Sequence, residues 1–597
     1  MAKQLVSLIL LLLVLFWAPV DAATGNRLAG HPSPYLALHG TDPVAWQEWN
    51  AETIARAKRE NKLLFVSVGY FACHWCHVMQ RESYKNREIA ALLNRDFIPV
   101  KVDRELNTGL DDALQTFSER LLRIAGWPLN AFVTPEGYPV YVVLYAPPEE
   151  FRGVLEKLSD RWKADRSGIE KLARQAVTES SVPQTQKLDR NTALQWQEKF
   201  LKLARAEGDE FRGGFGQVSK FPMSPQLALL LEQAAKAPDG EPAAFLKLTL
   251  DQMGAKGLRD HVGGGFFRYT VDPGWETPHF EKMLYDNAQL ARIYLRAAEI
   301  FKSPRYRDIG LGTLDFMIDV LRDRDGGYYT SISAVDRQGR EGTLYLWERD
   351  ALMKHLSAEE YAVARRIWRL DAARPFEFGY LPAEWVAPNQ VERAVLESAL
   401  KKLGKARAGR NLPKDDKRNA GLNGLALSAF SAGMKLDSKY AGHAANLARF
   451  ISTRLVRNDG LFKAVARGKQ IEGAELEDYA YVVTGLLDYA EAAKNPSARA
   501  LASRLTHRAW KQFFSGKGWR HEESPLLKTI QPEAILPDGA TPSPSAMLIA
   551  ASLRLGDDEL AARARQALSW QSADMARDPF VFATQIAAYQ LGSIQAK

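Results

Sequence analysis

The chain of 597 residues contains two cysteines, and both lie in one four-residue motif, Cys73-His74-Trp75-Cys76. The motif follows the apolar run Leu-Leu-Phe-Val-Ser-Val at 63–68, a pattern that predicts a central strand buried on both faces. No third cysteine remains to form a second bridge, so packing alone must hold the rest of the chain together. The strand and its motif predict a βα unit with a dithiol at the start of the helix.

The two cysteines are predicted to act in thiol–disulfide exchange. A cysteine in the first turn of a helix has a lowered pKa, because the helix dipole and free backbone amides stabilise its thiolate. Cys73 is therefore predicted to be the nucleophile, and Cys76, one turn later, the residue that resolves the mixed disulfide. His74 can add positive charge near the thiolate and so stabilise the reduced form.

Patterns on either side of the motif predict an α/β domain over residues 26–164. A strand is expected at 97–102 and a strand hairpin at 129–133 and 140–144, with helices between and after them. Pro128 stands directly before the first hairpin strand, where thioredoxin folds place a cis-proline that faces the dithiol. The order of elements therefore predicts a thioredoxin-like domain.

Three other kinds of site use the same residues. Cys73 to His77 also fits Cys-x-x-Cys-His, the attachment pattern of a c-type haem, although its position after a central strand disfavours haem. A zinc site would need both cysteines and both histidines of the motif to face one ion, which the start of a helix does not allow. A purely structural disulfide is the third alternative. We expect neither a metal nor a cofactor at this site.

The first residues predict export from the cytoplasm. One lysine precedes an apolar block at 5–17, and Pro19 and two small residues follow it, which is the pattern of a signal peptide over residues 1–22, cleaved after Ala22. The block is too short to span a bilayer, and no later segment approaches the necessary length. We therefore expect a periplasmic or secreted protein with no transmembrane segment in the mature chain.

The rest of the chain, 190–597, is predicted to be all-α and to follow a polar linker at 165–189. Amphipathic helices succeed one another for roughly 400 residues, and the loops between alternate helices are rich in Gly, Trp, His and carboxylates. Paired helices of this kind predict an α/α toroid with its site at the loop-rich mouth. The net charge of +8 arises from 79 basic and 71 acidic residues, and without a basic run no nucleic-acid partner is expected.

Several sequence motifs in both halves of the chain resemble those of a known family. They are Ser33-Pro34-Tyr35-Leu36, Pro43-Val44-Ala45-Trp46, Cys73-His74-Trp75-Cys76-His77, Gly126-Trp127-Pro128-Leu129-Asn130, Gly263-Gly264-Gly265-Phe266, the run from Pro278 to Asn287, Glu341-Gly342, Asn423-Gly424-Leu425 and Glu477-Asp478-Tyr479-Ala480. The chain resembles the YyaL or spermatogenesis-associated protein 20 type of thioredoxin domain-containing protein over nearly its whole mature length. The resemblance implies a thioredoxin-like domain followed by an (α/α)6 barrel similar to six-hairpin glycosidases and sugar epimerases.

The barrel offers acidic and histidine side chains for a second activity. Glycoside cleavage needs two carboxylates that flank the sugar, and the segment 279–287 brackets the start of a helix whose amides could orient an anion or a hydroxyl. Relatives resemble one another in an Asp-Ala-Asp run before Glu-Gly, whereas this chain keeps one acid there, Asp336. The loss of the other acid favours ligand binding over turnover. The predicted barrel residues are His279, Glu281, Asp286, Asp336, Glu341 and Asp478.

Two functional hypotheses follow from the sequence. In the first, the protein is an exported thiol–disulfide oxidoreductase whose barrel binds a thiol or disulfide protein partner. In the second, the barrel acts on or binds a sugar-like ligand, and the thioredoxin-like domain is an accessory.

Overall fold

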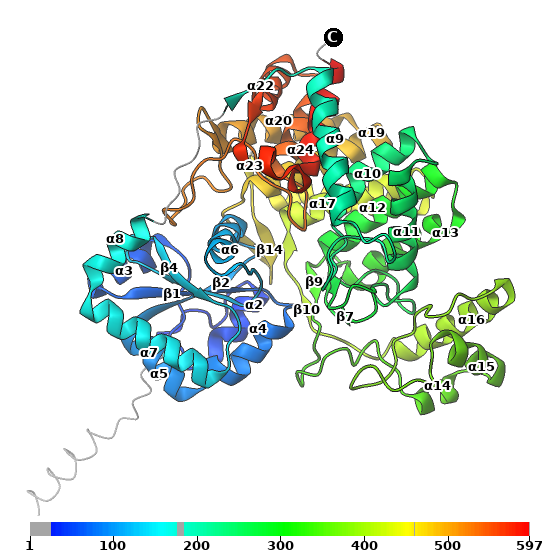
Figure 1. Ribbon diagram of the computed structural model, residues 1–597, viewed down its shortest axis with the longest axis horizontal. Coiled ribbons are helices and arrows are strands. Elements are labelled where there is room, and N and C mark those ends of the chain that lie inside the picture. Colours follow the sequence, from blue (N-terminus) through cyan, green and yellow to red (C-terminus); the bar gives the residue numbers. More distant parts are fainter. Residues whose placement is uncertain (1–24, 176–183, 459, 596–597) are drawn as a thin grey trace, which may run out of the picture.

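The computed structural model describes residues 25–175, 184–458 and 460–595. The predicted signal peptide, 1–22, lies outside these ranges. An α/β domain, blue to cyan in Figure 1, lies beside a larger helical domain, green to red. Within the described ranges, no helix is both long and apolar enough to cross a membrane.

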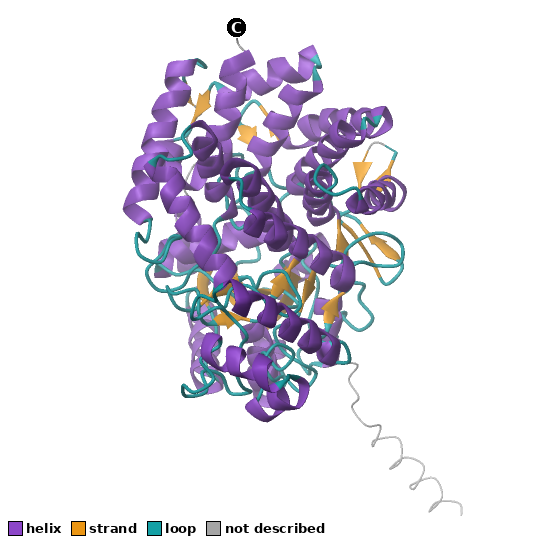
Figure 2. Cartoon of the chain, turned by 90° about the vertical axis from the view of Figure 1, so that its right-hand side faces the viewer, coloured by secondary structure: helices purple, strands orange, loops and turns teal. Residues whose placement is uncertain are grey.

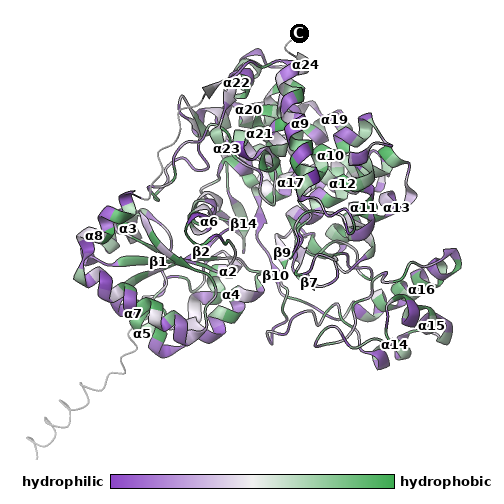
Figure 3. Ribbon diagram, viewed as in Figure 1, coloured by the Kyte–Doolittle hydropathy of each residue, from purple (hydrophilic) through white to green (hydrophobic). Residues whose placement is uncertain are grey.

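The α/β domain is built on one four-stranded sheet with the order β2-β1-β3-β4. The predicted central strand is β1, which runs parallel to β2 and antiparallel to β3. Both β1 and β2 are buried along their full lengths, and Figure 3 colours β1 as hydrophobic. The apolar sequence of β1 requires this burial, whereas β2 also buries Lys101 and Asp103. The strands are β1 Leu63–Gly69, β2 Phe97–Asp103, β3 Leu129–Val133 and β4 Pro139–Val143.

Helices cover the sheet, and side chains cap the start of several of them. Asn50 accepts a hydrogen bond from the backbone N–H of Thr53 at the start of α3, and Asn86 caps α5 in the same way. The helices of this domain include α2 Pro34–Leu38, α3 Ala51–Glu60, α4 His74–Met79, α5 Arg87–Asp96, α6 Thr108–Leu122 and α7 Pro148–Ala164.

The predicted linker, 165–189, contains regular structure in its described parts. Residues Arg166–Gln175 form helix α8, which contacts α7 and β4. Strand β5, Gln184–Thr185, pairs with β18, Trp570–Gln571, near the end of the chain. The segment is therefore attached to both domains, and its polar composition reflects exposure on one side of α8.

The second domain is a closed ring of helix pairs and confirms the predicted (α/α)6 barrel. Neighbouring inner helices touch one another around the whole ring, and α24 returns to contact α10. The domain is almost entirely helical, with short strands confined to its connections (Figure 2). The inner helices are α10 Ser224–Lys236, α12 Leu284–Phe301, α17 Ala420–Gly433, α19 Leu476–Ala493, α21 Pro544–Leu555 and α24 Ala583–Gln595, and the outer helices are α9 Arg190–Glu207, α11 Glu241–Ala255, α13 Pro304–Phe316, α18 Lys439–Phe450, α20 Pro496–Phe513 and α22 Asp558–Leu568.

An insertion between α13 and α17 forms a small helical lobe at the lower right of Figure 1. Its helices are α14 Arg349–His355, α15 Ala358–Ile367 and α16 Gln390–Arg407. They enclose a separate apolar core that includes Trp347 and Trp368. The sequence predicts helices here but not that they leave the ring.

Candidate functional site

Cys73 and Cys76 are joined in a disulfide at the start of α4. Cys73 is the residue that caps this helix, and its Sγ accepts a hydrogen bond from the backbone N–H of Cys76 at 3.1 Å. The sulfur of Cys73 thus lies at the positive end of the helix, as predicted from the sequence. Both cysteines are buried, with exposed fractions of 3% and 1%.

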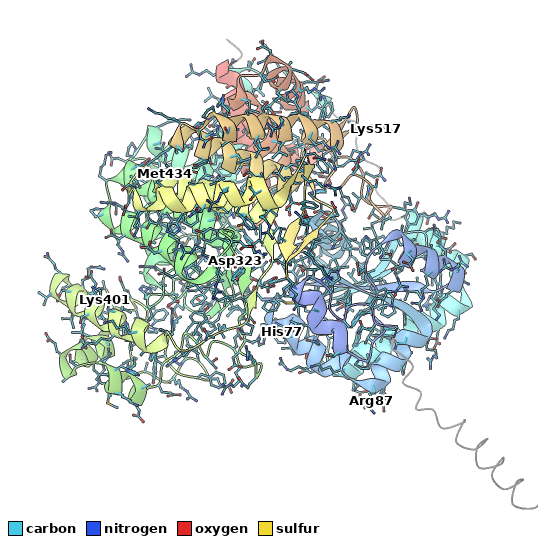
Figure 4. The ribbon with its side chains drawn as sticks, turned by 180° about the vertical axis from the view of Figure 1, so that it is seen from behind. His77, Arg87, Asp323, Lys401, Met434 and Lys517 are labelled. Atoms are coloured by element: carbon cyan, nitrogen blue, oxygen red, sulfur yellow. A yellow bond between two sulfur atoms is a disulfide. The ribbon has the colours of Figure 1, made fainter. Side chains whose placement is uncertain are left out.

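Pro128 also lies as predicted, directly before β3, and the Trp127–Pro128 peptide bond is cis. Because β3 pairs with β1, the bond lies at the end of the sheet from which the dithiol loop leaves. The role of Pro128 in exchange stays a prediction. His77 follows the dithiol where the two domains meet (Figure 4), and its Nε2 lies 2.8 Å from the carbonyl oxygen of Phe71.

His74 connects the dithiol loop to the helical domain. Its Nδ1 lies 3.5 Å from Oε2 of Glu341, and the other oxygen of Glu341 lies 2.7 Å from Nδ1 of His279. The two imidazole rings stack with their centres 5.8 Å apart. One carboxylate therefore serves two histidines, one from each domain. Two of the residues predicted in the barrel, His279 and Glu341, lie beside the dithiol.

The shared carboxylate separates the protonation states of the two histidines. Burial lowers the pKa of His74, and the charge of His279 adds to this effect, while Glu341 opposes it only in part. Burial would lower the pKa of His279 too, but the hydrogen bond and charge of Glu341 outweigh it and raise the pKa. Burial disfavours the Glu341 carboxylate, yet its contacts with His279 hold its pKa below the usual value. The arrangement thus favours a cationic His279 and a neutral His74.

Replacing Glu341 with glutamine should lower the stability of the protein in a defined pH window, because it removes the ion pair with His279. The raised pKa of His279 contributes stability that is lost as pH rises through that pKa, and the lowered pKa of Glu341 contributes stability that is lost as pH falls through it. The loss should therefore be greatest between the ordinary pKa values of 4.5 and 6.5, at about 1–2 kcal/mol for one charged hydrogen bond. Thermal unfolding followed against pH measures it.

The matched control is Glu52→Gln, which removes an exposed ion pair with Arg27. Its effect on the melting temperature should be small and nearly constant with pH. Equal pH profiles for wild type and Glu341→Gln would show that the His279–Glu341 pair contributes nothing to stability.

Aromatic contacts continue from the dithiol loop in both directions along the surface. His74 contacts Trp75, whose side chain is 42% exposed and packs on Tyr145 with ring centres 4.8 Å apart. On the other side, His279 packs on Tyr269, which stacks on Phe221. A row of partly exposed rings thus crosses from one domain to the other beside the disulfide.

A buried hydrogen-bonded chain joins the domains behind this row. The hydroxyl of Tyr70 donates to Oε2 of Glu281 at 2.8 Å and accepts from Arg268. The guanidinium groups of Arg268 and Arg104 lie 5.0 and 4.2 Å from the ring centre of Trp127. Glu281, predicted as a barrel acid, is therefore engaged by the α/β domain.

Asp286 lies in the first turn of α12 and is buried. Burial raises the pKa of Asp286 to about 8, and the nearby charge of Glu281 acts in the same direction, against the opposing charges of Arg268 and Arg104. Its Oδ2 has no hydrogen-bond partner among the described residues. Asp286 is therefore expected to be protonated at neutral pH.

Two buried lysines of the helical domain are each surrounded by carboxylates. Lys417 contacts Asp103 at 2.9 Å, Glu105 at 3.0 Å and also Asp415; we call these four residues the Lys417 cluster. Because Asp103 and Glu105 belong to the α/β domain, the cluster joins the two domains.

The second lysine, Lys463, contacts Glu475 at 2.9 Å, Asp478 at 3.0 Å and Glu477 at 3.3 Å. Glu475 also accepts a hydrogen bond from the backbone N–H of Thr108 at the start of α6. The predicted residue Asp478 thus belongs to a group apart from His279. It accepts hydrogen bonds from the backbone N–H groups of Glu475 and Gly421, which is a structural role.

Asp336 lies outside the group beside the dithiol. It accepts hydrogen bonds from the Arg340 side chain, from Thr343 and from two backbone N–H groups of a tight turn.

Sequence reasoning missed the groups that join the domains. Tyr70 directly after β1 and Arg268 in the Arg268-Tyr269 pair could have been found by their positions at strand and loop ends. The missed residues are Tyr70, Arg104, Arg268, Lys417 and Lys463.

Comparisons with known proteins give a family match for the first domain. Residues 25–180 match a thioredoxin-like family of the DsbH type, described as "Protein of unknown function, DUF255". Solved structures similar to the chain include a D-mannose isomerase, with 13% identity and a TM-score of 0.45 over 68% of this chain and 97% of that one. A thioredoxin from Thermus thermophilus has 21% identity and a TM-score of 0.18 over 21% of this chain and 94% of that one.

Relatives of known sequence extend over both domains. Spermatogenesis-associated protein 20 of Rattus norvegicus is 34% identical over 611 residues, which cover 90% of this chain and 76% of the relative. The protein of the same name from Homo sapiens is 34% identical over 566 residues, which cover 83% and 70%. Identity at this level over most of both chains means that this protein belongs to the family of spermatogenesis-associated protein 20.

Proposed function

We propose that the protein carries out thiol–disulfide exchange at Cys73 and Cys76 and that the helical domain binds its partner. The observation that carries this proposal is the placement of the Cys73 sulfur at the start of α4, where it accepts the N–H of Cys76. A thiolate in that position is stabilised by the same N–H group and by the helix dipole. Cys73 would attack a partner's sulfur and Cys76 would then release the partner.

The contacts of the barrel support a role in partner binding rather than a separate sugar reaction. Two acids and a histidine that the sequence offers for sugar chemistry, Glu281, Glu341 and His279, contact the α/β domain or each other beside the dithiol. Tyr269 and Phe221 extend the row of rings from the dithiol onto the barrel. These positions suit a partner that touches both domains, and they leave the carbohydrate hypothesis the less favoured of the two.

Replacing the resolving cysteine tests the exchange reaction. In Cys76→Ser the mixed disulfide on Cys73 has no internal thiol to attack it, so partner proteins should stay covalently bound. Non-reducing gels followed by mass spectrometry should show complexes that disappear with dithiothreitol. Cys73→Ser is the matched control and should capture nothing. If both variants give the same pattern, thiol–disulfide exchange with protein partners is the wrong function.

We also propose that the protein works outside the cytoplasm, as its N-terminal sequence suggests. An oxidising compartment would keep the pair as the disulfide until a partner reduces it. Mass analysis of the mature protein should find an N-terminus at Ala23, and a retained Met1 would contradict export by cleavage.

A further inference from the structure

The hydroxyl of Tyr35 is a buried polar group with no hydrogen-bond partner among the described residues. Tyr35 is 1% exposed and lies in α2, which Ser33 caps by accepting the N–H of Leu36. The hydroxyl of Ser33 also donates to Asp103 at 2.6 Å, which ties this short helix to the end of β2. Buried hydroxyls almost always have a partner, so this one calls for an explanation.

The unpartnered hydroxyl lies next to the sulfur of Cys76. A Cβ atom built on Gly69, the last residue of β1, would overlap the Tyr35 hydroxyl and come within 2.8 Å of Cys76 Sγ. The two groups are therefore within about 5 Å of each other, and glycine leaves the space between them open. Helices α2 and α4, which carry the two residues, lie on the side of the α/β domain that faces the helical domain (Figure 1).

The neighbouring tyrosine, Tyr84, is buried as deeply, but its hydroxyl has hydrogen-bond partners. Its hydroxyl donates to Asn130 at 2.7 Å and lies 2.9 Å from the hydroxyl of Ser67. Lys101 lies over both rings, with its Nζ 5.3 Å from the centre of Tyr35 and 4.7 Å from that of Tyr84. The two tyrosines thus share burial and a neighbouring lysine, and they differ in that the Tyr35 hydroxyl has no partner among the described residues and lies near Cys76 Sγ.

We infer that the Tyr35 hydroxyl is the hydrogen-bond donor that stabilises the thiolate of Cys76 when the disulfide is reduced. A disulfide sulfur is a weak acceptor, whereas a thiolate in the same place is a charged acceptor and binds a donor more strongly. The hydroxyl is therefore without a partner in the oxidised protein and gains one on reduction. This inference rests on the proposed exchange reaction and assigns a residue to its second step.

The step can be written with its atoms and electrons balanced. The Cys73 thiolate attacks a partner disulfide, an S–S bond forms between Cys73 and the partner, and the partner's other sulfur leaves as a thiolate. The Cys76 sulfur has already lost its proton to solvent in the reduced pair. The Cys76 thiolate, held by the Tyr35 hydroxyl, then attacks the sulfur of Cys73, which restores the disulfide and releases the second partner thiolate. The partner is reduced by two electrons and the protein is oxidised by two.

Tyr35 is suited to donate rather than to accept. Burial raises the pKa of Tyr35 well above its usual value, and nearby Tyr84, Asp103 and Asp42 act in the same direction. The hydroxyl therefore keeps its proton at neutral pH.

Tyr35→Phe in the full chain tests the inference, and Tyr84→Phe is the matched control. The reduction equilibrium of the pair against glutathione should shift about tenfold toward the disulfide in Tyr35→Phe, which is about 30 mV more negative. The pKa of the Cys76 thiol, measured by thiolate absorbance, should be higher in the double variant Cys73→Ser/Tyr35→Phe than in Cys73→Ser alone. Tyr84→Phe should leave the equilibrium within twofold of wild type.

A measurement on the wild type keeps the test independent of folding defects. The ring carbon that bears the Tyr35 hydroxyl should change its NMR shift on reduction, and that of Tyr84 should not. The inference would be overturned if Tyr35→Phe had the reduction equilibrium of the wild type, or if Tyr35→Phe and Tyr84→Phe shifted that equilibrium equally. Because the equilibrium is measured with glutathione, that result is distinct from a failure of Cys76→Ser to capture proteins, which would overturn the proposed function instead.

Discussion

Lys417→Met is expected to destabilise the protein by roughly 3–5 kcal/mol, because it removes the cation and leaves three buried carboxylates without compensation. Asp103, Glu105 and Asp415 are all nearly or completely buried around Lys417. Burial opposes the charged form of Lys417, but the three carboxylates outweigh it and raise its pKa. Chemical denaturation followed by tryptophan fluorescence measures the loss.

The loss should depend on pH in a direction that the cluster defines. Burial raises the pKa of Asp415 to about 8, and Glu105 and Asp103 add to this, while Lys417 opposes it. Burial also raises the pKa of Glu105. Without Lys417 the pKa values of Asp415 and Glu105 rise further, so the folded state binds more protons than the unfolded state and stability falls as pH rises. Lys417→Met should therefore be closer to wild type at pH 5 than at pH 8.

The control for this substitution is Lys439→Met, which removes an exposed lysine that lies 3.0 Å from Asp315. It should cost at most about 1 kcal/mol, since exposed ion pairs contribute little. If Lys417→Met behaved like Lys439→Met, the Lys417 cluster would not hold the domains together. In Lys417→Met the α/β domain and the helical domain should also unfold in separate thermal transitions, because Asp103 and Glu105 lie on one domain and Lys417 on the other.

The parts of the site that could be predicted from the sequence are those whose causes are local. The apolar run at β1 fixes a buried strand, and the cysteine after it caps α4 with its own side chain. Pro128 before β3 follows from the strand order. Each of these features depends on residues a few positions apart, so the pattern of one segment is enough.

The contacts between the domains could not be predicted in the same way. Lys417 meets Glu105 across a separation of 312 residues, and Tyr70 meets Glu281 across 211. Nothing in the local sequence of Lys417 distinguishes it from an exposed lysine, because the carboxylates that keep it charged come mostly from another domain. The acidity and loop position of Asp478 predict a site residue, but its carboxylate oxygens accept hydrogen bonds from backbone N–H groups. Acidity alone does not separate a cap from a reactive group.

Glycines in the barrel show the same limit, because a glycine inside a helix predicts weakness from local propensity. Gly424 lies in α17 and Gly485 in α19, and each faces the backbone of the other helix. A Cβ on Gly424 would overlap backbone atoms of Tyr481 and Val482. Glycine is therefore required here by the close approach of two inner helices.

Gly424→Ala should accordingly destabilise the protein by roughly 3 kcal/mol, at the upper end of the cost of overpacking, since the overlapping atoms are backbone and cannot rotate away. Gly442→Ala in α18 is the matched control, because its Cβ would meet nothing within 4 Å. That substitution should stabilise the protein by up to about 1 kcal/mol through helix propensity. Denaturation of both variants, with circular dichroism as the signal, gives the two values. A gain in both would mean that helix propensity alone decides the effect, and it would contradict the close packing of α17 on α19. A loss in both would mean that the cost of Gly424→Ala is not specific to the contact between these two helices. Opposite signs would show that the close spacing of α17 and α19 depends on the absence of a side chain at Gly424.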